Sequence, residues 1–279
     1  MKYCLNYIKN TKYLDDFDEI TIKFRPSDTS LVDFMIKHQH QRINIYIADN
    51  QDFLDNNRIK LFDAIKDEHP ELNFVFKLQE CQEELTQKVY QVIVNDERDF
   101  QFFFRTQAQD FDTFWGLVNL KPTSIYIVEA LGFNIKQCAE AAHEFGIDIR
   151  VYPNVAQSAW KTTPGIMKFF IRPEDVKVYE PYVDVMEFYG DDKKVATYYR
   201  IYAKDGEWFG NLNELIISLD EDIDSRCLLP QFAERRLGCG KRCLKGHRCQ
   251  ICAATQHLAK TLTKNNVTIR QLSKKVKTN

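Results

Sequence analysis

The sequence of 279 residues is 44% hydrophobic and 28% charged, with 20 Phe and 13 Tyr. This composition supports a large buried core and excludes wholesale disorder. No apolar run approaches the roughly 18 residues of a membrane span, and the start MKYCLNYIKN lacks the apolar segment of a secretory signal. We therefore expect a soluble, cytoplasmic protein without a membrane partner, built as one barrel-sized domain with an appendage.

Short runs rich in β-branched and aromatic residues recur through the first 190 residues, with amphipathic, helix-like stretches between them. The runs are ITIKFR (20–25), INIYIA (43–48), NFVFKL (73–78), QFFFR (101–105), SIYIVE (124–129), IDIRVY (147–152), KFFIR (168–172) and VDVMEF (183–188). Eight strand–helix alternations predict an α/β fold of the (β/α)8, TIM-barrel type. An open, doubly wound sheet is the main alternative.

Two parts of this series stay open, and one helix is well marked. KVYQVIV (88–94) could itself be a strand, and the last gap leaves room only for a short helix within PEDVKVYEPY. The stretch 134–145 predicts a helix that stops at Gly146. Its apolar face carries Ile135, Cys138, Ala139, Ala142 and Phe145.

Polar residues stand at the carboxyl ends of the expected strands, where barrels of this type carry their chemistry. Strand interiors buried on both faces rarely tolerate charge, so this set indicates a functional mouth. The alternative is that each strand simply ends in a polar residue on leaving the core. The candidate catalytic residues, with the two carboxylates as acid/base groups, are Glu129, Glu187 and Arg105. The candidate substrate-binding residues, suited to a carboxylate or phosphate, are Arg25, Lys77, Asn154 and Arg172.

The net charge of −2 conceals an uneven distribution. Residues 235–279 contain 12 Lys and Arg and no acidic residue, which leaves 26 basic and 40 acidic residues in 1–234. This basic segment suggests an anionic partner, RNA first and a protein second. The alternative is a solvated tail that docks on the acidic body. Within it, 253–266 predicts a helix and 267–279 a short, frayed terminus.

Five of the eight cysteines fall within 26 residues, with the spacing Cys227-x11-Cys239-x3-Cys243-x5-Cys249-x2-Cys252. In an intracellular chain of this size, such a run indicates a metal site rather than a disulfide framework. Four thiolates bind tetrahedral zinc or a [4Fe–4S] cluster, and His247 offers a nitrogen ligand instead. We accordingly expect a barrel domain over 1–225 and a cysteine-rich, basic extension over 226–279.

The cysteine run after an α/β barrel resembles the peptidase U32 (collagenase-like) family, in the branch whose motif begins with an Arg–Cys pair. The matching residues are Arg226, Cys227, Cys239, Cys243 and Leu244. The resemblance implies a [4Fe–4S] cluster on the three matching cysteines, with Cys249 and Cys252 competing as fourth ligand. It also implies oxygen-independent hydroxylation or modification of RNA or a small anionic substrate, besides the proteolysis that named the family. The extra cysteine pair and the compressed spacing depart from the family and leave zinc open.

Two functions follow from these observations. One is an iron–sulfur barrel enzyme that acts on RNA or a small anionic substrate. The other is a non-catalytic binding or structural protein, in which zinc stabilises a basic C-terminal module that contacts nucleic acid or a protein. The sequence contains no HExxH motif or recognisable Ser/His/Asp arrangement, so a peptidase would need an unfamiliar site.

Overall fold

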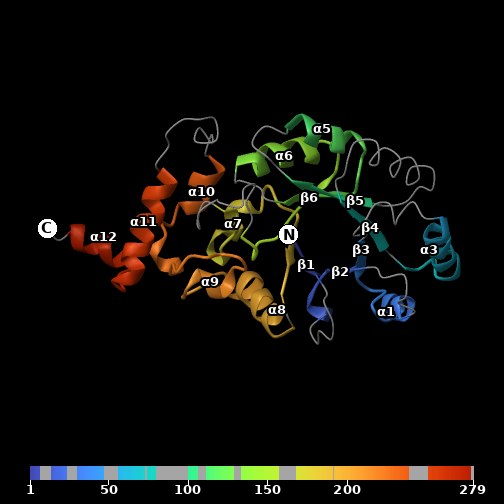
Figure 1. Cartoon of the computed structure of the whole chain (residues 1–279), viewed down its shortest axis with the longest axis horizontal. Coiled ribbons are helices and arrows are strands. Elements are labelled where there is room, and N and C mark those ends of the chain that lie inside the picture. Colours follow the sequence, from blue (N-terminus) through green and yellow to red (C-terminus); the bar gives the residue numbers. More distant parts are fainter. Residues whose placement is uncertain are drawn as a thin grey trace.

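A computed structural model describes residues 1–6, 14–23, 30–46, 56–72, 74–79, 100–105, 111–128, 133–156, 168–190, 192–238 and 251–277. Within these residues, eight strands form a closed barrel in which each strand pairs in parallel with the next. Figure 1 labels β1 to β6 of this barrel. The strands are β1 (Lys2–Asn6), β2 (Glu19–Lys23), β3 (Arg42–Tyr46), β4 (Phe74–Gln79), β5 (Phe100–Arg105), β6 (Ser124–Val128), β7 (Asp148–Val151) and β8 (Val185–Phe188).

The barrel closes through the pairing of β1 with β8, in which Cys4 lies opposite Glu187. The strands β7 and β8 also pair directly, with Arg150 opposite Val185. Because side chains alternate between the two faces of a strand, every second residue points into the barrel. These pairings confirm the α/β barrel and exclude the open sheet for the described residues.

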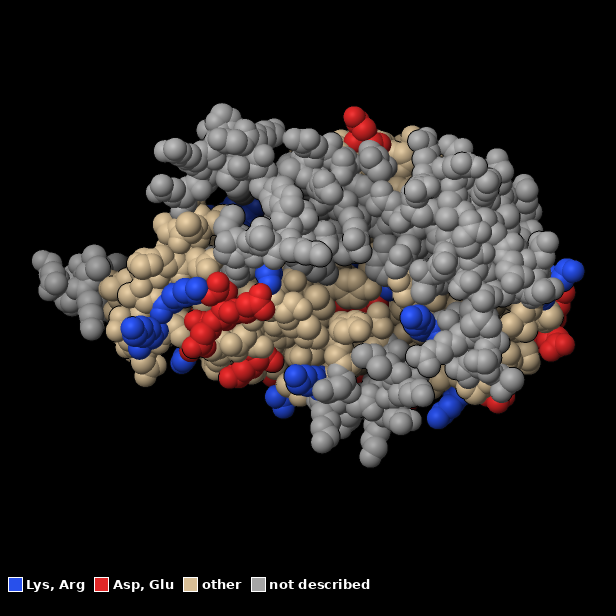
Figure 2. All heavy atoms as spheres, in the orientation of Figure 1, with Lys and Arg blue, Asp and Glu red and all other residues tan. Residues whose placement is uncertain are grey.

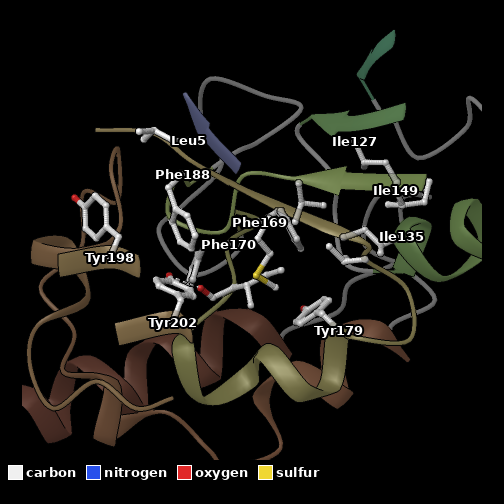
Figure 3. Packing of buried hydrophobic residues seen from close by; sticks show 14 of the residues in the cluster. Leu5, Ile127, Ile135, Ile149, Phe169, Phe170, Tyr179, Phe188, Tyr198 and Tyr202 are labelled. Atoms are coloured by element: carbon white, nitrogen blue, oxygen red, sulfur yellow. Dashed lines mark hydrogen bonds between the residues drawn. The ribbon is translucent and has the colours of Figure 1, made fainter. Parts of the chain in front are cut away.

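The expected strand at 168–172 is wrong, and β1 completes the barrel in its place. Phe169 and Phe170 are buried, which is why the run looks like a strand, but they pack outside the barrel. The ring of Phe169 meets Tyr179 edge-on and that of Phe170 stacks on Phe232. Figure 3 shows Phe169, Phe170 and Tyr179 gathered between the strands and the neighbouring helices. The open alternative at 88–94 lies outside the described residues.

Helices lie outside the strands, and those nearest the C-terminus lie to one side of the barrel (Figure 1). They are α1 (Leu31–Lys37), α3 (Asn56–Glu68), α5 (Phe111–Asn119), α6 (Phe133–His143), α7 (Val176–Tyr179), α8 (Asp192–Tyr199), α9 (Leu212–Leu215), α10 (Phe232–Leu237), α11 (Ile251–Lys264) and α12 (Ile269–Lys277). The short helix expected between the last two strands is α7.

Helix α6 confirms most of the predicted amphipathic pattern. Its expected face is buried at Ile135, Cys138, Ala139 and Ala142. Phe145, by contrast, is 49% exposed, because it lies beyond the end of the helix. Gly146 has a φ of 70°, the left-handed conformation that lets the chain turn back toward β7 at no steric cost.

The C-terminal residues form helix α12 rather than a frayed end. Thr268 accepts a hydrogen bond on its Oγ1 from the Gln271 amide at 3.3 Å, and its own amide donates to Gln271 Oε1 at 2.8 Å. This reciprocal arrangement is a capping box, which satisfies amides that the first turn of a helix leaves unpaired. The signal was present in the sequence as Thr-x-x-Gln. The hydrophobic core includes residues on both sides of residue 225, as far as Leu262. The boundary expected at residue 225, between the barrel domain and the C-terminal extension, stays a prediction.

Candidate functional site in the barrel interior

The centre of the site is an ion pair between Lys77 on β4 and Glu187 on β8. The Nζ atom of Lys77 lies 2.7 Å from Glu187 Oε1 and 2.8 Å from Oε2. Both side chains have no exposed surface. Both residues lie in the carboxyl halves of their strands, so the pair spans the barrel interior toward the end where barrels of this type carry their chemistry.

Three further side chains donate hydrogen bonds to the Glu187 carboxylate. Asn6 Nδ2 lies 2.9 Å from Oε1, Thr21 Oγ1 lies 3.1 Å from Oε2, and the Tyr126 hydroxyl also donates to Oε2. The Cys4 thiol lies 3.6 Å from Oε2. Buried charges need such partners, and this number of donors holds the carboxylate in one orientation.

A second ion pair lies at the amino end of the barrel, between Arg150 and Glu19. Arg150 Nη1 lies 2.6 Å from Glu19 Oε2, and Arg150 Nε donates to Ser124 Oγ at 2.7 Å. Arg150 Nη1 also lies 3.4 Å from the hydroxyl of Tyr126. Tyr126 therefore links the two ion pairs, because it contacts Arg150 on one side and Glu187 on the other.

The surroundings fix the protonation states in the pair. Burial alone would raise the pKa of Glu187, but the Lys77 charge and the hydrogen bonds from Lys77 and Tyr126 outweigh it and lower that pKa. Burial lowers the pKa of Lys77 despite the opposing effect of Glu187. Burial, reinforced by the Glu187 charge, raises the pKa of Tyr126 and Tyr152 well above 10.0. Near neutral pH the site thus contains a carboxylate and two protonated phenols.

Four of the predicted mouth residues have described side chains. Lys77 and Glu187 meet in the barrel, although Lys77 was expected to bind an anion and instead contacts a carboxylate of the chain. Asn154 lies just after β7, where its side chain bonds the backbone of Tyr189 in both directions, at 2.6 and 3.1 Å. Arg172 lies outside the barrel wall and pairs with Asp175 at 2.6 and 2.8 Å.

The remaining predicted residues are not placed by the structure. Arg25 and Glu129 lie outside the described residues, and for Arg105 the structure describes only the backbone, at the end of β5. The sequence reading missed the rest of the interior network. These residues are Cys4, Asn6, Glu19, Thr21, Asn44, Ser124, Tyr126, Arg150 and Tyr152. A period-two alternation within the strands would have identified several of them, since Ser124 and Tyr126, and Arg150 and Tyr152, are spaced by two.

The structure describes two cysteines of the C-terminal run, and they lie apart. Cys227 is buried, its thiol donates to the carbonyl of Val267 at 3.4 Å, and the neighbouring Asp224 amide bonds Thr263 Oγ1 at 3.0 Å. Cys252 lies in the first turn of α11, eleven residues before Thr263, which corresponds to about 16 Å of helix. Two thiolates on one zinc ion can be at most about 4.6 Å apart, twice the zinc–sulfur bond length. Cys227 and Cys252 therefore do not fit as ligands of the same ion.

Among the described residues, no group of three or more His, Cys, Asp or Glu side chains is arranged to hold a metal. Cys239, Cys243 and Cys249 lie outside those residues. Within the same parts of the chain, no helix has the length and apolar character needed to cross a membrane.

Comparison with known proteins gives a limited result. No family model matches the sequence, and no curated protein matches it. Among solved structures, the chain is similar to the U32 peptidase Mk0906, with a TM-score of 0.40 and 11% sequence identity. That match covers 68% of this chain and 92% of the other.

Proposed function

We propose that this chain is an enzyme that performs acid–base chemistry on a substrate bound at the carboxyl ends of the barrel strands. The observation that carries the proposal is the convergence of Lys77, Tyr126, Thr21 and Asn6 on the Glu187 carboxylate. These residues come from five strands, and catalytic residues of α/β barrels come from the ends of several strands. A carboxylate held in one orientation by surrounding donors is suited to exchange a proton with a bound molecule.

The position of the pair supports access from the carboxyl end. Asn6 is the last residue of β1 and Tyr152 directly follows β7, so both lie on that side of the pair. Both are only partly buried, and each contacts the pair: Asn6 bonds Glu187, and Tyr152 accepts from Lys77 at 3.1 Å. Asn6 and Tyr152 therefore lie between the pair and the carboxyl end of the barrel.

For the substrate we propose RNA or a small anionic molecule, with RNA bound through the basic segment 235–279. Part of that positive charge is neutralised within the molecule, because Lys260 on α11 pairs with Glu221. Figure 2 shows basic and acidic side chains intermixed at this end of the molecule. Any RNA contact would depend on the other basic residues of the segment, through phosphate neutralisation.

We also propose a metal centre in the cysteine run, a [4Fe–4S] cluster or, alternatively, a zinc ion. A cluster would supply one-electron transfer, while Glu187 and Lys77 would bind and transfer protons. Because Cys227 and Cys252 do not fit one centre, four thiolate ligands would have to be Cys239, Cys243 and Cys249 with one of those two.

Metal analysis of two serine variants tests the ligand set. The full chain is purified without oxygen, and iron, sulfide and zinc are measured together with the visible spectrum. We expect that only one of Cys227→Ser and Cys252→Ser loses the metal, whereas Cys138→Ser, which alters a buried cysteine of α6, retains it. Equal loss of metal in both variants of the cysteine run would contradict the geometry, and a chain without iron or zinc would refute the centre.

Complementation of a deletion strain tests the enzymatic function. The strain receives the wild-type chain, Glu187→Gln or Glu140→Gln, and mass spectrometry then compares its RNA nucleosides and its soluble metabolites. We expect the deletion to change one of these profiles and Glu187→Gln to fail to restore it at equal protein level. Glu140, which is exposed and pairs with Lys136 on α6, provides the matched control and should restore the profile fully.

The nature of the changed compound separates the substrates. Loss of a modified nucleoside would identify RNA, and accumulation of a small anion would identify a metabolite. Full restoration by Glu187→Gln would refute the catalytic role of the pair and favour the scaffold function with a zinc-stabilised C-terminal module.

A further inference from the structure

We propose that Lys77 is a nucleophile that forms an imine with a small aldehyde or ketone. The inference rests on the proposed function, because it uses the same buried pair, and it adds a substrate class and a covalent step. An amine attacks a carbonyl only after losing its proton, so a reactive lysine needs a nearby proton acceptor and an environment that disfavours its charge.

The geometry around Lys77 meets both requirements. Its Nζ lies within 2.8 Å of both oxygens of the Glu187 carboxylate, which can accept the proton. Two aromatic rings enclose the amine, with the Tyr126 ring centroid 3.8 Å and the Tyr152 centroid 5.4 Å from Nζ. Because the side chain has no exposed surface, the neutral amine is favoured relative to its state in water.

The charges of the interior favour an uncharged reacting group. Lys77 balances Glu187 and Arg150 balances Glu19, so each of the two fully buried ion pairs in the described interior is neutral. A phosphate or carboxylate placed beside Lys77 would have to displace Glu187 and leave that carboxylate buried without its cation, which is costly. A carbonyl group carries no charge and can enter without that cost.

The step balances with the groups present. The Lys77 ammonium gives one proton to Glu187, and its nitrogen lone pair then forms a C–N bond while the carbonyl π electrons move to oxygen. The proton on Glu187, or the phenol proton of Tyr126 that already points to Glu187, neutralises that oxygen. The nitrogen then gives a second proton to Glu187, which is again ionised, and Glu187 passes it to the hydroxyl. The C–O bond breaks as water leaves, and the nitrogen lone pair forms the C=N bond of an imine that keeps the third ammonium proton. No oxidant or reductant takes part.

The protonated phenols suit this sequence. Tyr126 donates to Glu187 Oε2, and Tyr152 accepts a hydrogen bond from Lys77 Nζ at 3.1 Å. The Tyr126 hydroxyl therefore lies beside Glu187 Oε2 and the Tyr152 hydroxyl beside Lys77 Nζ. Protons must move between these two atoms. Tyr152 is partly buried and lies on the carboxyl side, so the carbonyl compound would approach past it.

Reductive trapping tests the proposal. The full chain is incubated with glycolaldehyde, or separately with pyruvate, and treated with sodium borohydride, which reduces an imine to a stable secondary amine. Peptide mapping then measures the modified fraction of each lysine. We expect Lys77 to be modified in clear excess over the exposed Lys136, and the rate at Lys77 to fall about a hundredfold in Glu187→Gln, the size of a lost general base. Glycolaldehyde should react better than pyruvate, because the carboxylate of pyruvate adjoins the reacting carbonyl and would lie beside Glu187.

The controls keep the result interpretable. Lys77→Arg retains a cation and should show no adduct at this position, with its fold checked by thermal unfolding. Modification of Lys77 no greater than that of Lys136 would overturn the imine. If Glu187→Gln still failed to complement the deletion strain, the acid–base function would stand without the imine. If Glu187→Gln complemented fully and no adduct formed, both would fall.

Discussion

Replacing Lys77 by Met tests whether the two charges in the barrel depend on each other for stability. The Lys77 and Glu187 side chains are both fully buried, and their charged atoms lie 2.7 Å apart. Removing the ammonium leaves the carboxylate with hydrogen bonds from Tyr126, Thr21 and Asn6 but, among the described side chains, no cation in contact. Breaking a buried pair in this way costs about 3–5 kcal/mol of unfolding free energy, because the remaining charge stays desolvated.

That loss can be measured as a shift in Tm. One kcal/mol lowers Tm by about 2–4 °C in domains of 150–250 residues, so we expect a fall on the order of 10 °C. The double variant Lys77→Met/Glu187→Gln removes both charges and should recover to within about 2 kcal/mol of the wild type. In the single variant burial would be the main remaining influence on the carboxylate and would raise the pKa of Glu187. The loss should therefore be smaller at pH 5 than at pH 8.

Thermal unfolding followed by circular dichroism gives all these values. Lys136→Met is the matched control, because its partner Glu140 lies 3.9 Å away and both side chains are about half exposed. That exposed helical pair should contribute no more than about 0.5 kcal/mol. If the double variant were as unstable as Lys77→Met, the two charges would not be coupled, and the account of the site would be wrong.

Two further predictions concern acid stability and the last helix. The pKa values of Glu19 and Glu187 are lowered from 4.5, because Arg150 and Lys77 outweigh the opposing effect of burial. The stability that these ionised carboxylates contribute is therefore present above pH 4.5. It is lost as the pH falls through their folded-state pKa values. Tm should therefore fall steeply below pH 4.5, and less steeply in Glu187→Gln; equal slopes would contradict this assignment. Thr268→Ala should lower the stability of the first turn of α12 by about 1 kcal/mol and accelerate amide hydrogen exchange there about fivefold. Ser273→Ala is the control, because in the described contacts that hydroxyl bonds only the Ile269 carbonyl, and it should leave the exchange rate unchanged.

The sequence by itself determined most of the barrel. Seven of the strand runs are barrel strands, because β-branched and aromatic residues at regular spacing mark buried parallel strands locally. It also singled out Lys77 and Glu187, since charged residues within such strands are unusual. The expected strand at 168–172 is wrong, because the buried run at Phe169–Ile171 has the composition of a strand but packs outside the barrel.

Only the tertiary structure decided which of these side chains meet. Lys77 and Glu187 are 110 residues apart, and their contact depends on closure of the barrel through β1 and β8. Tyr126 reads as an ordinary core aromatic in the sequence. Its link between the two ion pairs appears only when pairing through β7 brings β6 near β8. In the cysteine run, by contrast, residues that are near in sequence lie apart in space. Cys227 and Cys252 are close in sequence, yet the rigid rise of α11 separates them, because a helix fixes distances that a sequence spacing leaves free.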